Sequence, residues 1–150
     1  RRISMNILRK SNRASILVTV AAAALLLTTY SSMSFAEEVT VTLGGNQEVP
    51  AVMTSASGSG TIMINDDMTV GGSVTTTGIE ATAAHIHMAA TGKNGPVIVP
   101  LKKSGEDMWS VPAGAKLTEA QFKAFKAGGL YVNVHSAAHK GGEIRGQLNP

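Results

Sequence analysis

The histidines of this chain have the side-chain type and the spacing that metal coordination requires. The four histidines fall in two short stretches, His85 and His87 in the first, His135 and His139 in the second. Side chains two residues apart in a β-strand project from one face, about 6.6 Å apart along the backbone. Two imidazoles at that separation can converge on one ion through metal–nitrogen bonds of about 2 Å. The His-Ile-His sequence therefore predicts part of a metal site.

The second stretch has the same alternation. Val132 and Val134 are expected to face the core, so His135 lies on the outer side of its strand, as His85 and His87 do on theirs. If the two strands are neighbours, three imidazoles meet on one surface. His139 follows in a glycine-containing loop and is an optional fourth ligand. We predict a mononuclear site on the outer face of the sheet.

The absence of cysteine narrows the chemistry of such a site. Thiolate metal sites, iron–sulfur clusters, disulfides and cysteine nucleophiles are all excluded. A set of imidazoles suits copper, zinc, nickel or iron, whereas calcium and magnesium need oxygen ligands that no nearby acidic motif supplies. Copper is the first expectation and zinc the second. Because only neutral imidazoles bind metal, affinity is expected to fall below about pH 6.5.

Arg145 is the other candidate functional residue. Ile144, Gly146 and Leu148 alternate toward the core, which points Arg145 outward. We expect it to pair with Glu143 or another surface carboxylate, and the alternative is that it attracts an anion. We do not expect a serine hydrolase, because the chain has no Gly-x-Ser-x-Gly elbow.

Short strands must position these side chains. Alternating apolar residues separated by Gly, Asn, Asp and Pro turns predict an antiparallel β-sandwich or barrel. One short helix is expected near 118–127, because Thr118-Glu119-Ala120-Gln121 fits a capping box and Gly128-Gly129 a C-terminal stop. The predicted strands are Val39–Leu43, Thr61–Ile64, Met68–Thr77, Ala81–Met88, Val97–Leu101, Trp109–Val111, Leu130–His135 and Glu143–Leu148.

Residues 1–36 are typical of a secretory signal peptide. They hold five basic residues and no acidic ones, followed by the apolar run Ala14–Leu27 and by Ser34-Phe35-Ala36 before a cleavage point. The run is short for a membrane span of about 20 residues, although an uncleaved anchor is the alternative. We predict one extracytoplasmic domain, residues 37–150, with no membrane span after cleavage.

The predicted domain does not have the composition of a nucleic-acid-binding protein. The chain as a whole carries a formal charge of +3, but residues 37–150 hold eight basic and ten acidic residues. Their net charge of −2 offers no basic surface for phosphates. Four aromatic residues remain there, too few for a row of base-stacking platforms.

Two sequence blocks resemble the signature blocks of the CHRD domain, named after chordin. They are Ala81–Leu101, with His-Ile-His, and Leu117–Leu148, with Tyr-Val-Asn-Val-His and Gly-Glu-Ile-Arg-Gly-Gln; Gln47–Pro50 and Ser57–Gly60 resemble the opening of the domain. The resemblance spans nearly all of residues 38–150. It implies a secreted all-β module without a settled biochemical activity.

The histidines are also similar, more weakly, to those of Cu/Zn superoxide dismutase. That resemblance implies a Greek-key β-sandwich in which His85, His87 and His135 would match copper ligands and Arg145 an anion-attracting arginine. The chain departs from it in lacking a bridging histidine between Gly92 and Leu101, a zinc-site cluster and a disulfide.

Three functions follow as alternatives. The first is an exported binding module with a His-rich copper or zinc site formed by His85, His87, His135 and, optionally, His139. The second is a metal-free structural or adhesive module that binds extracellular or cell-envelope proteins. The third is a copper redox enzyme of the dismutase type, which would need an open coordination position on the metal.

Overall fold

The computed structural model describes residues 36–150. The expected signal segment, residues 1–36, lies outside the described residues except for Ala36. Within residues 36–150, none of the helices has the length and apolar character that crossing a membrane requires.

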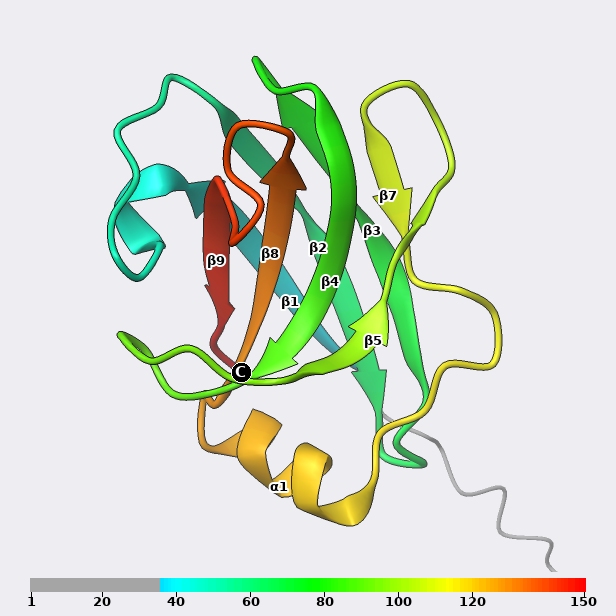
Figure 1. The fold of residues 1–150 in the computed structure, drawn as a ribbon. Helices are drawn as coiled ribbons and strands as arrows, with labels where there is room; N and C mark the ends of the chain where they lie inside the picture. Colours follow the sequence, from blue (N-terminus) through cyan, green and yellow to red (C-terminus); the bar gives the residue numbers. More distant parts are fainter. Residues whose placement is uncertain (1–35) are drawn as a thin grey trace, which may run out of the picture. The chain divides into compact units, whose positions relative to one another are not determined.

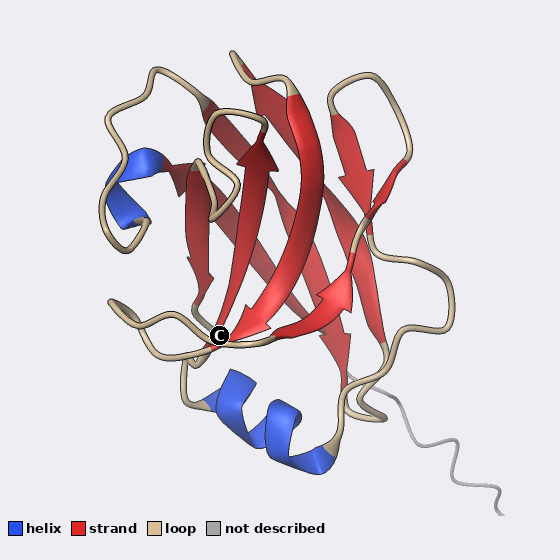
Figure 2. Cartoon of the chain, viewed as in Figure 1, coloured by secondary structure: helices blue, strands red, loops and turns tan. Residues whose placement is uncertain are grey.

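The described chain consists of short strands and one α-helix, as expected (Figure 2). Each of the eight predicted strands is present, and the sequence did not indicate β6 or the single 3-10 turn η1. The elements are β1 (Ala36–Gly44), η1 (Gly45–Gln47), β2 (Ser57–Asn65), β3 (Val70–Thr77), β4 (Ala81–Met88), β5 (Val97–Pro100), β6 (Lys102–Lys103), β7 (Met108–Ser110), α1 (Glu119–Lys126), β8 (Leu130–Ser136) and β9 (Ile144–Leu148).

All nine strands form one antiparallel sheet in the order β5-β4-β8-β9-β1-β2-β3-β7-β6. The sheet curls on itself, because its two edge strands are consecutive pieces of chain separated by Leu101 alone. The N–H of Leu101 donates to the carbonyl of Ala84 on β4 at 2.9 Å and so continues the pairing of β4 with β5 to the point where the chain enters β6. The result is a nearly closed barrel-like sheet, which confirms the predicted antiparallel all-β class (Figure 1).

The core lies between the two sides of the curled sheet. Alternate residues of the strands point inward, among them Ala84 and Ile86 of β4 and Val132 and Val134 of β8, all fully or almost fully buried. The helix α1 lies at one end of the sheet and inserts Phe125 into the core (Figure 1). Its predicted capping box is present, since the Thr118 hydroxyl accepts from the Gln121 N–H and the Gln121 side chain accepts from the Thr118 N–H.

The outer face of β8 and β9 is covered by loops. Two segments lie over it, residues 45–56 and the β4–β5 loop, residues 89–96, and the side chain of Asn94 joins them by donating to the carbonyl of Val49 at 2.7 Å. Asn133 and Arg145, which the alternation points outward, are therefore buried, with 2% and 1% of their surface exposed. The alternation gave the direction of these side chains correctly, but the face they occupy is a second, polar interior.

Candidate metal centre

The strands β4 and β8 are neighbours, which is the condition for the histidines to meet. Their antiparallel register places Ala83 opposite His135, His85 opposite Asn133 and His87 opposite Tyr131. One ring nitrogen from each of His85, His87 and His135 lies within 4.8 Å of the other two. Three imidazoles from two adjacent strands thus form one cluster, named here the histidine triad.

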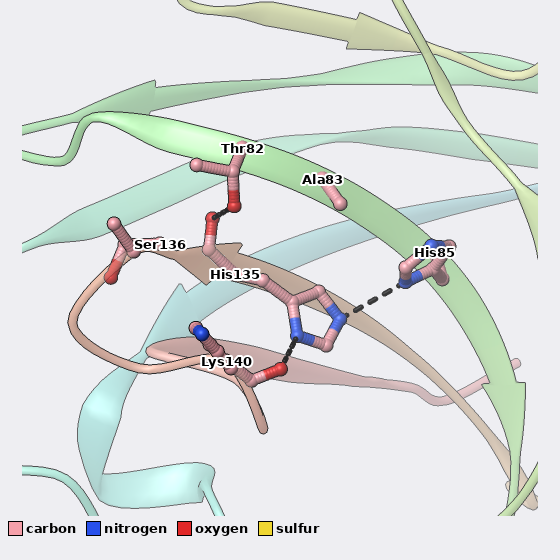
Figure 3. A pocket seen from close by; sticks show the side chains of 7 residues that line it. Thr82, Ala83, His85, His135, Ser136 and Lys140 are labelled. Carbon is pink, nitrogen blue, oxygen red and sulfur yellow. Dashed lines mark hydrogen bonds between the residues drawn. The ribbon is translucent and has the colours of Figure 1, made fainter.

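The orientation of His135 is set by the loop that follows β8. Its Nδ1 lies 2.9 Å from the carbonyl oxygen of Lys140, and because a carbonyl only accepts, Nδ1 carries the ring proton (Figure 3). The lone pair is therefore on Nε2, which lies 3.0 Å from Nδ1 of His85. A backbone carbonyl thus fixes the tautomer that offers Nε2 to the triad.

His87 is fixed in the same way by the β4–β5 loop. Its Nδ1 donates to the carbonyl oxygen of Gly95 at 3.0 Å, which leaves the lone pair on Nε2. That Nε2 is buried and has no hydrogen-bond partner. A buried polar atom without a partner is costly, by about 1–3 kcal/mol, and proteins rarely retain one. The orphaned nitrogen belongs to the same cluster as the rings of His85 and His135.

The spacing of the donors is close to that of a coordinated ion. Nitrogens bound to one metal at about 2 Å in a tetrahedral arrangement lie about 3.3 Å apart. The nitrogens of the triad lie between 3.0 Å and 4.8 Å apart, so small side-chain rotations bring all of them to that distance. The donor set is entirely imidazole, which suits copper and zinc.

Burial favours the neutral form of His85 and His87. It lowers the pKa of His85 below the ordinary value, and the neighbouring His135 and His87 lower this pKa further. Burial also lowers the pKa of His87, although the hydrogen bond to Gly95 opposes that effect. Neutral rings are the metal-binding form, because a protonated nitrogen has no lone pair to donate.

The chain matches a known protein family over most of the described residues. The family described as CHRD domain matches residues 39–148, which include the whole triad and the strands that carry it. The chain belongs to the CHRD family. Neither the comparison with curated proteins nor the comparison with solved structures found a match.

Arg145 of the CHRD domain is a structural residue of the loop cover. Its Nη1 donates to the carbonyl of Lys93 at 2.9 Å and its Nη2 to the side chain of Gln147 at 3.1 Å. Among residues 36–150 no ion pair joins Arg145 to Glu143, whose carboxylate accepts instead from Ser136 and Thr54. Arg145 as a whole is 1% exposed, so it does not face solvent as an anion-attracting group would.

Tyr131 links this arginine to the triad. The guanidinium carbon of Arg145 lies 3.4 Å from the centre of the Tyr131 ring, and the His87 ring stacks on Tyr131 with 4.9 Å between centroids. β8 lies between β4 and β9, so Tyr131 stands between the two side chains. Its hydroxyl also accepts from the Gly95 N–H at 3.2 Å. The CHRD domain thus packs Arg145, Tyr131 and the β4–β5 loop around His87.

Glu48 and Asn133 form a buried pair beside the triad. The Asn133 side chain donates to the Glu48 carboxylate, and Asn133 lies directly opposite His85. Burial raises the pKa of Glu48 to about 7, with Arg145 opposing the shift. The sequence did indicate where Tyr131 and Asn133 lie. Like His135, they alternate with the core valines of β8, so all three share the outer face of that strand. The strand pattern gave no indication of Glu48 or Gly95, because both reach the site through loops, although both lie in segments that resemble the CHRD domain.

His139 lies apart from the triad. Its backbone N–H donates to the Ser136 hydroxyl at 3.1 Å, in the turn between β8 and β9. Its side chain lines a separate polar depression together with Glu48 and Asn94. Of the four histidines of the CHRD domain, the structure therefore brings three together and leaves the fourth, His139, outside the cluster.

Proposed function

We propose that this chain is an exported CHRD module that binds one metal ion, copper in the first place and zinc in the second. The ligands are His85, His87 and His135. The single observation that carries the proposal is the buried Nε2 of His87, which has no hydrogen-bond partner and lies in a cluster with two other imidazoles. A bound ion would satisfy that nitrogen.

The surroundings of the triad support metal binding. Ligating histidines commonly donate their second ring nitrogen to a carbonyl or carboxylate, which fixes the ring and raises its basicity. His87 and His135 each have such a partner in the carbonyls of Gly95 and Lys140. These contacts hold two of the three ligands in place before any ion arrives, and so reduce the entropy lost on binding.

The donor set favours copper over the harder cations. Three neutral imidazoles provide nitrogen ligands and no compensating negative charge, a combination that suits copper or zinc and is poor for calcium or magnesium. Copper binds a given nitrogen site more strongly than the other divalent ions of the first transition row. Three protein ligands also leave one coordination position for an outside ligand.

Export is part of the proposal. It rests on the basic and apolar pattern of residues 1–36 and on membership of the CHRD family. The metal ion is the proposed partner in an extracytoplasmic location, and an extracellular or cell-envelope protein is the partner under the metal-free alternative. The dismutase alternative loses its anion-attracting arginine, because Arg145 is buried and bonded to the loop.

Metal titration of the purified protein tests the proposal. The chelator-treated protein is titrated with Cu(II) and Zn(II) at pH 7.5, and metal content is measured after gel filtration. We expect one Cu(II) per chain, nitrogen hyperfine coupling in its electron paramagnetic resonance spectrum and a higher melting temperature. Absence of stoichiometric binding by either ion would remove the proposal and favour the metal-free structural module.

A further inference from the structure

A cavity of about 430 Å³ adjoins the histidine triad on one side. His85 and His135 form part of its wall, together with Thr82 and Ala83 of β4 and with Ala137 and Lys140 of the β8–β9 loop (Figure 3). Its volume lies within the range of small-molecule sites, about 300–1,000 Å³. Nothing in the proposed metal site itself requires a space of this size.

The cavity lies on the accessible side of the triad. His87 does not line it, since its ring is buried against Tyr131 and under the Gly95 carbonyl, and its Nε2 has no contact with solvent. The rings of His85 and His135 are partly exposed and face the cavity. An ion bound by the triad would therefore be enclosed on the His87 side, and the cavity is the open space beside its other two ligands.

We propose that this cavity is a binding site for a small anion that occupies the fourth position of the metal. The inference rests on the proposed metal site and adds the class of its outside ligand. The ligand donates a lone pair to the ion while the rest of it lies against Ala83 and Ala137. Their small side chains leave the space open between β4 and the β8–β9 loop.

The charges of the wall select an anion. Lys140 is the charged residue among the described residues that line the cavity, and no carboxylate lines it. A divalent ion bound by three neutral imidazoles would add two further positive charges, and none of its ligands carries a negative charge. The electrostatic field of Lys140 and of the metal ion would attract anions and repel cations. The apolar part of the wall limits the ligand to one that is small and carries little hydrogen-bonding capacity away from the metal.

Azide is a suitable probe, because it is a small anion whose binding to Cu(II) produces a charge-transfer absorption band. The copper-loaded full chain is titrated with sodium azide at pH 7.5, and in parallel with imidazole, a neutral nitrogen ligand. We expect the azide band to appear with saturation and the paramagnetic resonance spectrum to change with it. Lys140→Gln should weaken azide binding about threefold to tenfold and leave imidazole binding unchanged.

A second variant tests the location. Ala83→Leu fills the cavity from β4, on a position that is not a ligand, and should reduce binding of azide and imidazole alike by more than tenfold while one copper ion is still bound. Ala137→Leu, from the opposite wall, should act in the same way and serves as an independent measurement if Ala83→Leu lowers copper content.

The outcomes are distinguishable. A protein that binds no copper overturns the metal site and this inference together. A protein that binds copper but shows no azide band overturns only the inference. Equal azide affinity in the wild type, Ala83→Leu and Ala137→Leu places the ligand elsewhere and also overturns it.

Discussion

Nδ1 of His85 lies 3.0 Å from Nε2 of His135, across the two adjacent strands β4 and β8. Because the Lys140 carbonyl holds the proton of His135 on Nδ1, the proton between the two rings belongs to His85. A metal ion bound between these rings would need both nitrogens unprotonated, so the His85 proton would have to leave Nδ1. Without metal, this hydrogen bond joins two of the three rings of the triad.

Substitution of single histidines distinguishes the proposed ligands of the triad from His139. In His87→Ala the enclosed ligand is lost, and we expect copper affinity to fall by about 100-fold or more. In His139→Ala, a matched change outside the triad, we expect affinity within about twofold of the wild type. Competition titration against a chelator of known affinity measures both variants. Equal losses in the two variants would contradict the assignment of ligands.

Gly95 lies where its backbone approaches β4 too closely for any side chain. A Cβ at Gly95 would lie 1.9 Å from the carbonyl oxygen of Met88, so Gly95→Ala must displace the loop and with it the carbonyl that orients His87. We expect a copper affinity about 10-fold to 100-fold lower. Gly92→Ala is the control in the same loop, because no atom lies within 4 Å of its added Cβ.

The Gly92 control carries a small cost of its own. Gly92 has a φ of +74°, so alanine there is strained by about 1 kcal/mol and lowers stability without moving the Gly95 carbonyl. We therefore expect Gly92→Ala to melt at a slightly lower temperature with unchanged copper affinity. A Gly92→Ala protein that loses affinity as strongly as Gly95→Ala would show that general loosening of the loop, and not displacement of one carbonyl, is responsible.

Arg145 should contribute more to the stability of the fold than to metal binding. Arg145→Met leaves the carbonyl of Lys93 without its donor, and Glu48 without the nearby positive charge. We expect the free energy of unfolding to fall by about 3 kcal/mol. Arg145→Lys should recover little of it, because one ammonium cannot reach both the loop and Gln147. Urea unfolding of the metal-free proteins gives the values, and unchanged stability would contradict this role.

Glu48 should make stability depend on pH. Burial raises its folded pKa to about 7, above the value of 4.5 for an ordinary glutamate, so the folded state binds more protons than the unfolded state between these values. The contribution of Glu48 to the free energy of unfolding is fully present below pH 4.5 and is lost as the pH rises toward 7. Relative to Glu48→Gln, which cannot ionise, the wild type should lose up to about 2 kcal/mol of its free energy of unfolding between pH 5 and pH 7.5.

The comparison with Glu48→Gln is needed because the buried histidines act in the opposite direction. Burial lowers the pKa of His85 and His87 in the folded state, so the unfolded state binds more protons below pH 6.5 and stability falls as the pH falls. Both proteins keep these histidines, so the difference between them isolates Glu48. Urea unfolding in the presence of EDTA measures it, and a difference that is constant with pH would contradict the prediction.

Much of the fold and the core of the site could be predicted from local sequence. The alternation of apolar residues located the strands, and it placed Ile86 and Val134 in the core and His85, His87 and His135 on the opposite face. The capping box at Thr118 located the helix. These are properties of a few neighbouring residues, because the period of a strand or the first turn of a helix is fixed by backbone geometry alone.

The tertiary structure decided what lies over that face. Alternation points Arg145 outward, but it does not say whether that side faces solvent. Arg145 is covered because the β4–β5 loop, 52 and 51 residues away along the chain, accepts its hydrogen bonds at Lys93 and Asn94. Asn133 is bonded to Glu48, 85 residues away along the chain. By itself the sequence determined which side chains share a face. Only the folded chain decided that Gly95 covers His87 while His85 and His135 remain open to a cavity, because that choice depends on contacts between distant segments.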